Sequence, residues 1–425
     1  MRAALWLMAL FAIAVASALF AGSNQGTVTV FWSPYRVDLS LNLVLLVLAA
    51  SFVIFHFAMR ALSALMRIPH QARRWRLLQK ERAIHGALLD SLSHLVSGRF
   101  VRARKAAELV VSLEKSVERG GEHLVYAARL RTLVHLLAAE SAQALQDRSV
   151  RDAHFQSALE QSGSRGAQDA RDGVQLRAAR WALEDRDAGA ALQWLDQLPQ
   201  GAARRTVALR LRFKAAKMAG QPQVALETAR LLTKHRAFSK VAGNSIVRGL
   251  AIELIQAAYD PVQIQRAWDS LEKAEQTMPD VAVEAAERLL AEGGSSVLAR
   301  QWLLPVWDAM VQRADALALQ QRVRLARVLD RSFGALEGTP DTAWLTRIEA
   351  AQMGNPRDAV LQYLAGVVCM RLSLWGKARQ LLKQSLAMVQ DRELKRDTWL
   401  ALAQMAEQQQ DAAAATEAYR EAAKR

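Results

Sequence analysis

The chain has few of the residues that stabilise small secreted domains or build β-sheets. It contains one cysteine, Cys369, in 425 residues, so no intramolecular disulfide can form, and a reducing compartment is mildly favoured. Glycine and proline number only 21 and 9, and aromatic residues make up 6%. Scarce glycine and proline argue against long disordered segments, and scarce aromatic residues argue against sheets. The abundant Ala, Leu, Arg, Gln and Glu predict an all-α fold.

Sequence motifs of known chemistry are also missing. The glycine pair at Gly293 and Gly294 has no apolar strand before it, unlike a phosphate or dinucleotide loop. The sequence has no HExxH, CxxC or EF-hand spacing, and its eight histidines are dispersed. We therefore predict no catalytic residue, no metal ligand and no cofactor-binding residue, with Cys369 as a buried structural thiol. The chain is not expected to be an enzyme.

Two long apolar segments stand near the N-terminus. Residues 3–21 contain no charge and would form a helix of about 28 Å, and residues 39–59 one of about 31 Å. Both lengths match the hydrocarbon thickness of a bilayer, so we predict a transmembrane hairpin with an outside loop at 22–38. A cleaved signal peptide ending near Ala18 is the alternative for the first span. The span is favoured because Arg2 is the only charge before it and its apolar run is long.

Basic residues follow the second span closely. Between Met1 and Arg82 there are nine Lys and Arg against two acids, a net charge of +7 out of +15. Since cytoplasmic flanks collect positive charge, both termini are predicted in the cytoplasm, with the short loop outside. We expect this cluster to contact anionic lipid, and nucleic acid is the weaker alternative. Its members are Arg60, Arg67, Arg73, Arg74, Arg76, Lys80 and Arg82.

Two features of the hairpin leave alternatives open. The loop alternates through Thr27-Val28-Thr29-Val30 and breaks at Ser33-Pro34, which fits a small β-hairpin against the outer membrane surface or a plain connector. His56 is ionisable within the second span, so a porphyrin-ligand or proton-relay role is one hypothesis. It lies about one turn from the cytoplasmic end, which favours interface anchoring.

After a basic juxtamembrane helix at 61–87, residues 88–425 consist of amphipathic helical stretches separated by short turns. Alanines recur in a constant setting with gaps of 50, 37, 35, 42, 111 and 37 residues. A period in the middle thirties is typical of the tetratricopeptide (TPR) helix-turn-helix repeat. The sequence therefore predicts a TPR-like α-solenoid, least regular at 280–349. The expected repeat-packing residues are Ala103, Ala153, Ala190, Ala225, Ala267, Ala378 and Ala415.

A solenoid of this kind exposes an extended concave face lined mainly by the first helix of each repeat. Residues 124–138, 175–183, 206–218 and 359–372 are the expected first helices. We predict a basic groove in the first half of the array, suited to acidic helices of a protein partner or to porphyrin propionates. The alternative is that these arginines face solvent on the convex side. They are Arg129, Arg131, Arg177, Arg180, Arg210 and Arg212.

The chain combines a first span ending AGSNQG, a TVTVFW…YRVDLSL loop, a second span, a basic exit and the TPR-like array. In this combination it resembles, over essentially its whole length, the HemY family of proteobacterial inner-membrane proteins, which implies a location in a bacterial inner membrane. The resemblance also implies a role late in protohaem synthesis, as a scaffold for haem-pathway enzymes or a tetrapyrrole intermediate, and implies no catalytic residues. A flavin-dependent oxidase has carried the same label, but this chain lacks its glycine-rich motif. The alternatives are a direct haem or porphyrin carrier or enzyme, and an envelope-assembly scaffold unrelated to haem.

Overall fold

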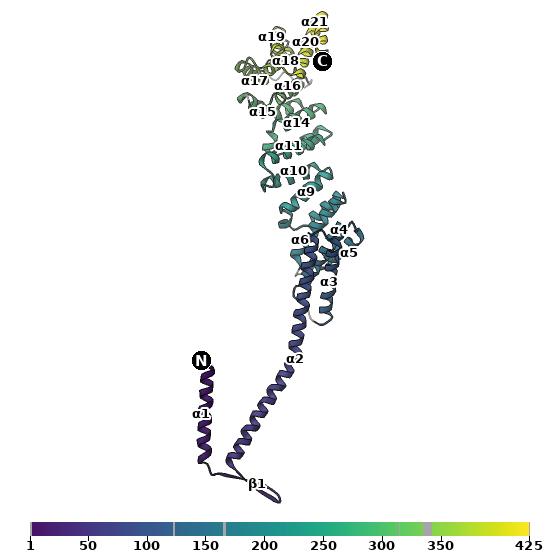
Figure 1. The fold of residues 1–425 in the computed structure, drawn as a ribbon. Helices are drawn as coiled ribbons and strands as arrows, with labels where there is room; N and C mark the ends of the chain where they lie inside the picture. Colours follow the sequence, from purple (N-terminus) through teal and green to yellow (C-terminus); the bar gives the residue numbers. More distant parts are fainter. Residues whose placement is uncertain (1, 122–123, 165–166, 314, 335–341, 425) are drawn as a thin grey trace. The chain divides into compact units, whose positions relative to one another are not determined.

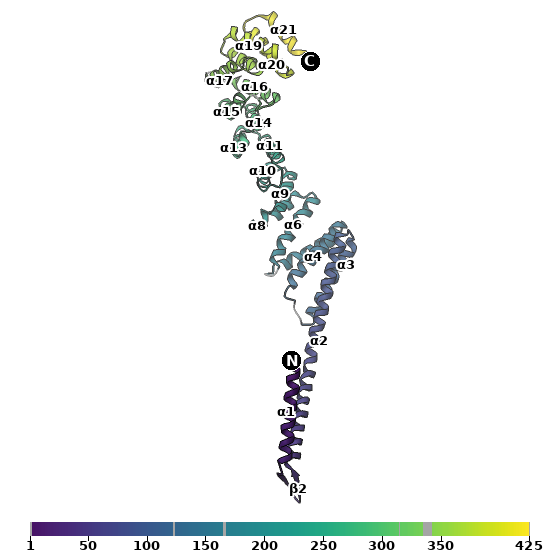
Figure 2. The same ribbon diagram turned by 60° about the vertical axis from the view of Figure 1, so that its left-hand side comes forward.

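The computed structural model describes residues 2–121, 124–164, 167–313, 315–334 and 342–424. Within these, the side chains of residues 2–5, 7, 64–74, 169 and 342 are not described. The chain divides into two compact units, Met1–Ala170 (unit 1) and Arg171–Arg425 (unit 2). Over the residues that the structure describes, the fold is helical except for one two-stranded sheet, and Figures 1 and 2 show the helices following one another along the chain. The predicted all-α class is thus confirmed for the repeats.

The bounds of the elements are as follows. Unit 1 contains α1 (Arg2–Ser23), β1 (Thr27–Trp32), β2 (Tyr35–Ser40), α2 (Leu41–Val96), α3 (Phe100–Glu118), α4 (Ala127–Ala144) and α5 (Arg148–Ser162). The boundary with unit 2 falls in the first turn of α6 (Gln168–Glu184). Unit 2 continues with α7 (Ala188–Asp196), α8 (Gln200–Ala203), α9 (Thr206–Met218), α10 (Pro222–Lys234), α11 (Lys240–Gln256), α12 (Pro261–Asp269), α13 (Lys273–Gln276) and α14 (Pro279–Ala291). It ends with α15 (Ser296–Gln312), α16 (Leu319–Gly334), α17 (Thr342–Gly354), α18 (Ala359–Arg371), α19 (Trp375–Met388), α20 (Arg392–Gln408) and α21 (Ala412–Ala423).

The apolar N-terminal segments differ in length. Among the described residues, one helix is long and apolar enough to cross a membrane, Leu41–Ser63 at the start of α2. The apolar part of α1, Met8–Ser23, falls in the shorter class of 10–17 residues. One candidate span is therefore present, and the two-span hairpin stays a prediction. The helix α2 continues without interruption to Val96, so the boundaries expected at residues 60 and 87 lie inside one helix.

The helices after this segment pack in consecutive pairs, as a TPR-like solenoid requires. Contacts join α2 with α3, α4 with α5, α9 with α10, α18 with α19, and α20 with α21. First helices of neighbouring pairs also touch, since α14 contacts α16, α16 contacts α18, and α18 contacts α20. Residues 280–349, expected to be least regular, contain all but the first residue of α14, then α15, α16 and part of α17.

A common turn sets the register within many pairs. The first helix ends at a residue with positive φ, a conformation that lets the chain reverse after a helix, and the fifth residue after it is buried at the helix–helix contact. The turn and buried residues are Gly98 and Ala103, Gln146 and Arg151, Arg186 and Ala191, Gly220 and Ala225, Ser373 and Ala378, and Gln410 and Ala415. Small residues at this position let the two helices approach closely.

This register separates the expected packing alanines into groups. Ala103, Ala225, Ala378 and Ala415 are buried. Ala190 and Ala267 are only partly buried, and Ala153 is exposed. Ala191 occupies the buried position beside Ala190, and in the pair that contains Ala153 the equivalent position is Arg151, which is 9% exposed and donates to Gln143 Oε1 at 2.7 Å. Alanine spacing alone does not reveal such an offset, because the turn residue that fixes it is often not glycine.

Helix α18 has an unexpected environment. Every residue from Val360 to Met370 is buried, including Cys369. The helices α16, α17, α19 and α20 all contact it. We expected residues 359–372 to line an open concave face, and this expectation is wrong for most of the helix, because four neighbours cover it.

Candidate functional site

The basic cluster predicted after the second span lies on α2. Arg60, Arg76 and Arg82 are exposed there. The Lys80 side chain is half-buried, and its Nζ donates to the carbonyl of Ser116 at 3.0 Å, so this cation is partly used inside unit 1. The side chains of Arg67, Arg73 and Arg74 lie outside those described. His56 is exposed in the apolar part of α2, next to the ring of Phe57.

The six arginines predicted to form a groove fall in both units, with Arg129 and Arg131 in unit 1 and the others in unit 2. Arg131 pairs with Glu114 and Glu118, each at 2.7 Å. Arg180 Nε lies 3.0 Å from Glu184 Oε1, and Arg212 Nη2 lies 2.6 Å from Asp196 Oδ1. Arg129 and Arg210 are exposed, and Arg177 is partly buried. Carboxylates of the same chain thus neutralise at least three of the six, so the basic character available to a partner is weaker than predicted.

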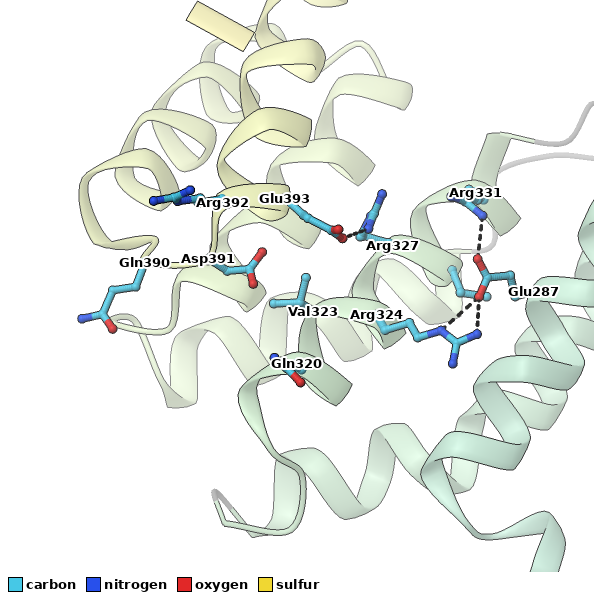
Figure 3. A pocket seen from close by; sticks show the side chains of 11 residues that line it. Glu287, Gln320, Val323, Arg324, Arg327, Arg331, Gln390, Asp391, Arg392 and Glu393 are labelled. Carbon is cyan, nitrogen blue, oxygen red and sulfur yellow. Dashed lines mark hydrogen bonds and ion pairs between the residues drawn. The ribbon is translucent and has the colours of Figure 1, made fainter. Parts of the chain in front are cut away.

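A more organised polar site lies in unit 2, between α14, α16 and the start of α20. Arg324, Arg327 and Arg331 follow one another on α16 at spacings of three and four residues, which places them on one face of the helix. They line a cavity of about 560 Å³ together with Glu287, Gln320, Arg392 and Glu393 (Figure 3). We call this cavity the arginine groove.

Glu287 of α14 holds one side of the arginine groove. Its Oε2 lies 2.7 Å from Arg324 Nη2, and its Oε1 lies 3.0 Å from Arg331 Nη1 (Figure 3). Arg324 also pairs with Glu284, one turn earlier on α14. Each carboxylate oxygen of Glu287 therefore has a guanidinium partner, and the two first helices are joined by charge-assisted hydrogen bonds.

Arg327 joins α16 to α20 on the other side. It pairs with Glu393 at the start of α20 and, through Nε, with Asp397 Oδ2 at 2.7 Å. The Asp397 side chain is only 15% exposed. Burial raises the pKa of its carboxyl above the ordinary value, and the positive charge of Arg327 opposes that rise. The pair is thus a partly desolvated contact between repeats.

A smaller cavity of about 260 Å³ adjoins the arginine groove and shares Arg327 and Arg331. Here Asp330 accepts from Tyr363 Oη at 2.7 Å and from Arg371 Nη2 at 2.8 Å. Burial, together with the nearby Asp330 charge, raises the pKa of Tyr363, so the phenol stays protonated and donates. The ion pairs thus continue across α14, α16, α18 and α20.

The arrangement is a network of compensated charges that joins neighbouring repeats. Arg324, Arg327 and Arg331 each have a carboxylate of the same chain, so they offer a partner less free positive charge than their number indicates. A partner that binds here has to exchange its own charges with these pairs. Over the part of the chain that the structure describes, no group of three or more His, Cys, Asp or Glu could hold a metal ion.

Sequence reasoning missed the arginine groove because its pairs connect distant segments. Arg327 and Glu393 are 66 residues apart, and Arg331 and Glu287 are 44 residues apart. A local signal did exist: the stretch RVRLARVLDR places three arginines on one helical face. This stretch lies within residues 280–349, where the repeat pattern is least regular in the sequence.

Comparison with known proteins gives a family match for one part of the chain. Residues 26–146 match the family model described as HemY protein N-terminus. The curated proteins gave no match to this chain.

Solved structures similar to the chain match it at low identity. They include Naa15/Naa10 bound to HypK-THB (12% identity, 77% of this chain and 57% of that chain, TM-score 0.23). A second is the APC/C hetero-tetramer Cut9-Hcn1, with 14% identity, coverage of 80% of this chain and 66% of that chain, and a TM-score of 0.29. A third is the P58(IPK) TPR domain, with 15% identity, coverage of 77% of this chain and 99% of that chain, and a TM-score of 0.22. The chain spans less than two thirds of the first two, and such low TM-scores carry no argument, so the description of the solenoid depends on the chain's own helix pairs. The family-model match, by contrast, shows that residues 26–146 carry the N-terminal domain of the HemY family, which confirms the resemblance found in the sequence.

Proposed function

We propose that the chain is a membrane-tethered TPR-like scaffold. It gathers haem-biosynthesis enzymes, or a tetrapyrrole intermediate, at the cytoplasmic face of a bacterial inner membrane. The observation that carries the proposal is the double role of α2. Residues Leu41–Ser63 of this helix are apolar and none of them is buried, whereas Ile84, Ala87 and Ser91 of the same helix are buried against the first repeat. One helix thus serves as both anchor and first packing element.

The same helix sets how far the repeats lie from the bilayer. From Ser63 to Ile84 the helix rises about 30 Å. The first repeat would thus be held on the order of 30 Å from the membrane surface. The proposal includes α1 as a second span, with the exposed Arg60, Arg76 and Arg82 on the cytoplasmic side.

Partner binding is assigned to the arginine groove and the adjoining cavity. The support is that α14, α16 and the start of α20 bring acidic and basic side chains together around the arginine groove, and that α16, α18 and α20 do the same around the adjoining cavity. The proposal assigns binding and no catalysis to the chain, and it assigns no resident cofactor. The HemY match favours haem-pathway partners over those of a general envelope scaffold.

Affinity capture of the full chain from native membranes tests the partner. Wild type should retain haem-pathway enzymes, and the double variant Arg324→Gln/Arg327→Gln should lose about tenfold of that enrichment. The matched control is Arg266→Gln/Arg420→Gln, two exposed arginines on second helices of unit 2. Thermal unfolding should show all three proteins folded.

Two results would overturn the proposal. One is enrichment of envelope proteins with no haem-pathway enzyme among them. The other is turnover of a tetrapyrrole by the purified chain without partners. Orientation is tested separately, since a reporter active only in the periplasm and fused after Arg425 should stay silent.

A further inference from the structure

The β-hairpin between α1 and α2 has two chemically different faces. Strands β1 and β2 pair antiparallel, with Val28 opposite Leu39, Val30 opposite Val37, and Trp32 opposite Tyr35. Directly paired residues share a face of the sheet, and successive residues alternate between faces. The apolar face therefore consists of Val28, Val30, Trp32, Tyr35, Val37 and Leu39. The polar face consists of Thr27, Thr29, Phe31, Arg36, Asp38 and Ser40.

Side chains on the polar face bond to one another. Thr29 Oγ1 donates to Asp38 Oδ1 at 2.6 Å, and Arg36 Nε lies 3.4 Å from the same oxygen. The Arg36 guanidinium also lies over the Phe31 ring, 5.6 Å from its centroid. Both charges of the hairpin are thus on this face and paired, as suits a surface toward water.

The apolar face is uncovered at its outer end. Trp32 is 77% exposed, Tyr35 is 73% exposed, and Val30 and Val37 are exposed as well. An isolated two-stranded hairpin is marginally stable in water, and six apolar side chains on one face call for a surface that covers them.

The attachment of the hairpin to α2 indicates what covers it. The Ser40 side chain caps α2 by accepting from the Leu43 N–H, and the Leu41 N–H donates to the Gly26 carbonyl at 2.9 Å. The sheet is therefore fastened to the first residue of the apolar helix Leu41–Ser63. Lipid around that helix would begin directly beside the hairpin.

We propose that the hairpin lies flat on the membrane, with its apolar face in the lipid interface and its polar face toward water. Trp32 and Tyr35 at the tip act as interfacial anchors, because such aromatic rings favour the headgroup level. Membrane lipid is the occupant of the apolar face. This inference rests on the proposed function, which places Leu41–Ser63 in a bilayer.

Fluorophore labelling of single introduced cysteines in the full chain tests the assignment. Cys369 can stay, because it is buried and its burial raises the pKa of its thiol, so it labels slowly. Val30→Cys and Val37→Cys report the apolar face, and Thr29→Cys and Arg36→Cys report the polar face. Leu46→Cys reports the span. Each protein is placed in nanodiscs of phosphatidylcholine and phosphatidylglycerol, with or without nitroxide-labelled lipid.

Labels at Val30 and Val37 should be quenched by nitroxide lipid and be at least fivefold less accessible to iodide than those at Thr29 and Arg36. Equal iodide access on both faces, with the Leu46 label in lipid, would overturn the hairpin inference alone. Iodide access at Leu46 would overturn the membrane proposal as well. Cross-linking of Val30→Cys between two chains would assign the face to a second copy and overturn lipid as its occupant.

A second set of variants tests the anchoring aromatics. Trp32→Ser/Tyr35→Ser should raise iodide access of the Val30 label several-fold. Phe31→Ser is the matched control, since Phe31 is equally exposed at 76% but lies on the polar face, and it should leave that access unchanged. Equal effects of the two changes would overturn the assigned faces.

Discussion

Each compact unit contains an apolar helix, and the two helices have opposite surroundings. In unit 2, α18 is buried from Val360 to Met370 by four neighbouring helices. In unit 1, none of Leu41–Ser63 at the start of α2 is buried. An apolar helix must be covered on all sides, and the repeats supply that cover only to α18. The proposed function assigns lipid as the cover of the longer helix.

A charge placed in each helix should give the largest difference. Leu364 is fully buried in α18, and Leu46 is 65% exposed in α2. Leu364→Lys should destabilise unit 2 by more than about 4 kcal/mol, because an unpaired charge loses its water. Leu46→Lys should leave thermal unfolding in detergent unchanged and instead make insertion less favourable by about 3 kcal/mol. Circular dichroism and membrane fractionation measure the two effects, and unchanged membrane retention of Leu46→Lys would contradict a span there.

The next largest difference between the two units should be in how acid changes their folding stability. His135 of α4 faces His154 of α5, with 3.1 Å between their Nδ1 atoms. Burial, aided by His154, Lys115 and Arg131, lowers the pKa of His135 to about 4. Between about pH 6.5 and 4, His135 is therefore neutral in the folded state and protonated in the unfolded state. The free energy of unfolding is unaffected by this group above that window and falls by at most about 3 kcal/mol as the pH drops through it. Denaturant unfolding from pH 7 to 4 measures this, and His135→Gln should flatten it.

Asp397 in unit 2 gives a pH dependence of folding stability with the opposite sign. Its raised pKa means that the folded state keeps a proton that the unfolded state releases. The stability that protonated Asp397 contributes is therefore greatest below the ordinary aspartate pKa, and it is lost as the pH rises through the raised pKa of the folded state. Asp397→Asn should remove that decline in unit 2 and leave the acid response of unit 1 unchanged. The same acid response for both units would contradict these assignments.

Two glycines allow a smaller test of packing. A Cβ on Gly366 of α18 would lie 2.8 Å from Leu382 Cγ, whereas a Cβ on Gly86 of α2 would meet nothing within 4 Å. Gly366→Ala should destabilise by about 1–2 kcal/mol, because overpacking outweighs the gain in helix propensity. Gly86→Ala should stabilise by up to about 1 kcal/mol. Chemical denaturation of both variants checks the signs, and a gain in stability for Gly366→Ala would show that Leu382 can move aside.

The sequence allowed prediction of features that local physics determines. Repeat length, helix pairing and the buried Ala103, Ala225, Ala378 and Ala415 follow from amphipathic periodicity and short turns. Side-chain partners across repeats do not follow. Arg327 of α16 and Glu393 of α20 are paired because the three helices between them pack so as to bring the two residues together. The burial of α18 likewise depends on helices both before and after it in the sequence. The hairpin lies between these cases, because its alternation was visible but the pairing register was needed to define its faces.

The smallest effect on folding should come from the exposed cations that follow the apolar helix. Arg60, Arg76 and Arg82 are exposed, so changing all three to Gln should alter unfolding by less than about 1 kcal/mol in total. A cation at the surface of an anionic leaflet contributes about 1 kcal/mol of attraction, which falls off within a Debye length, so most of this attraction should come from Arg60. Loss of all three cations should weaken the charge bias that orients the anchor. A periplasmic reporter fused after Arg425 should therefore gain activity in the triple variant. The matched control, Arg266→Gln/Arg313→Gln/Arg420→Gln, removes three exposed arginines of unit 2 and should leave the reporter silent. A thermal midpoint lowered by several degrees in the first variant alone would instead show that these arginines stabilise unit 1. The basic segment would then contribute to folding, and the difference between the two apolar helices could not be explained by their cover alone.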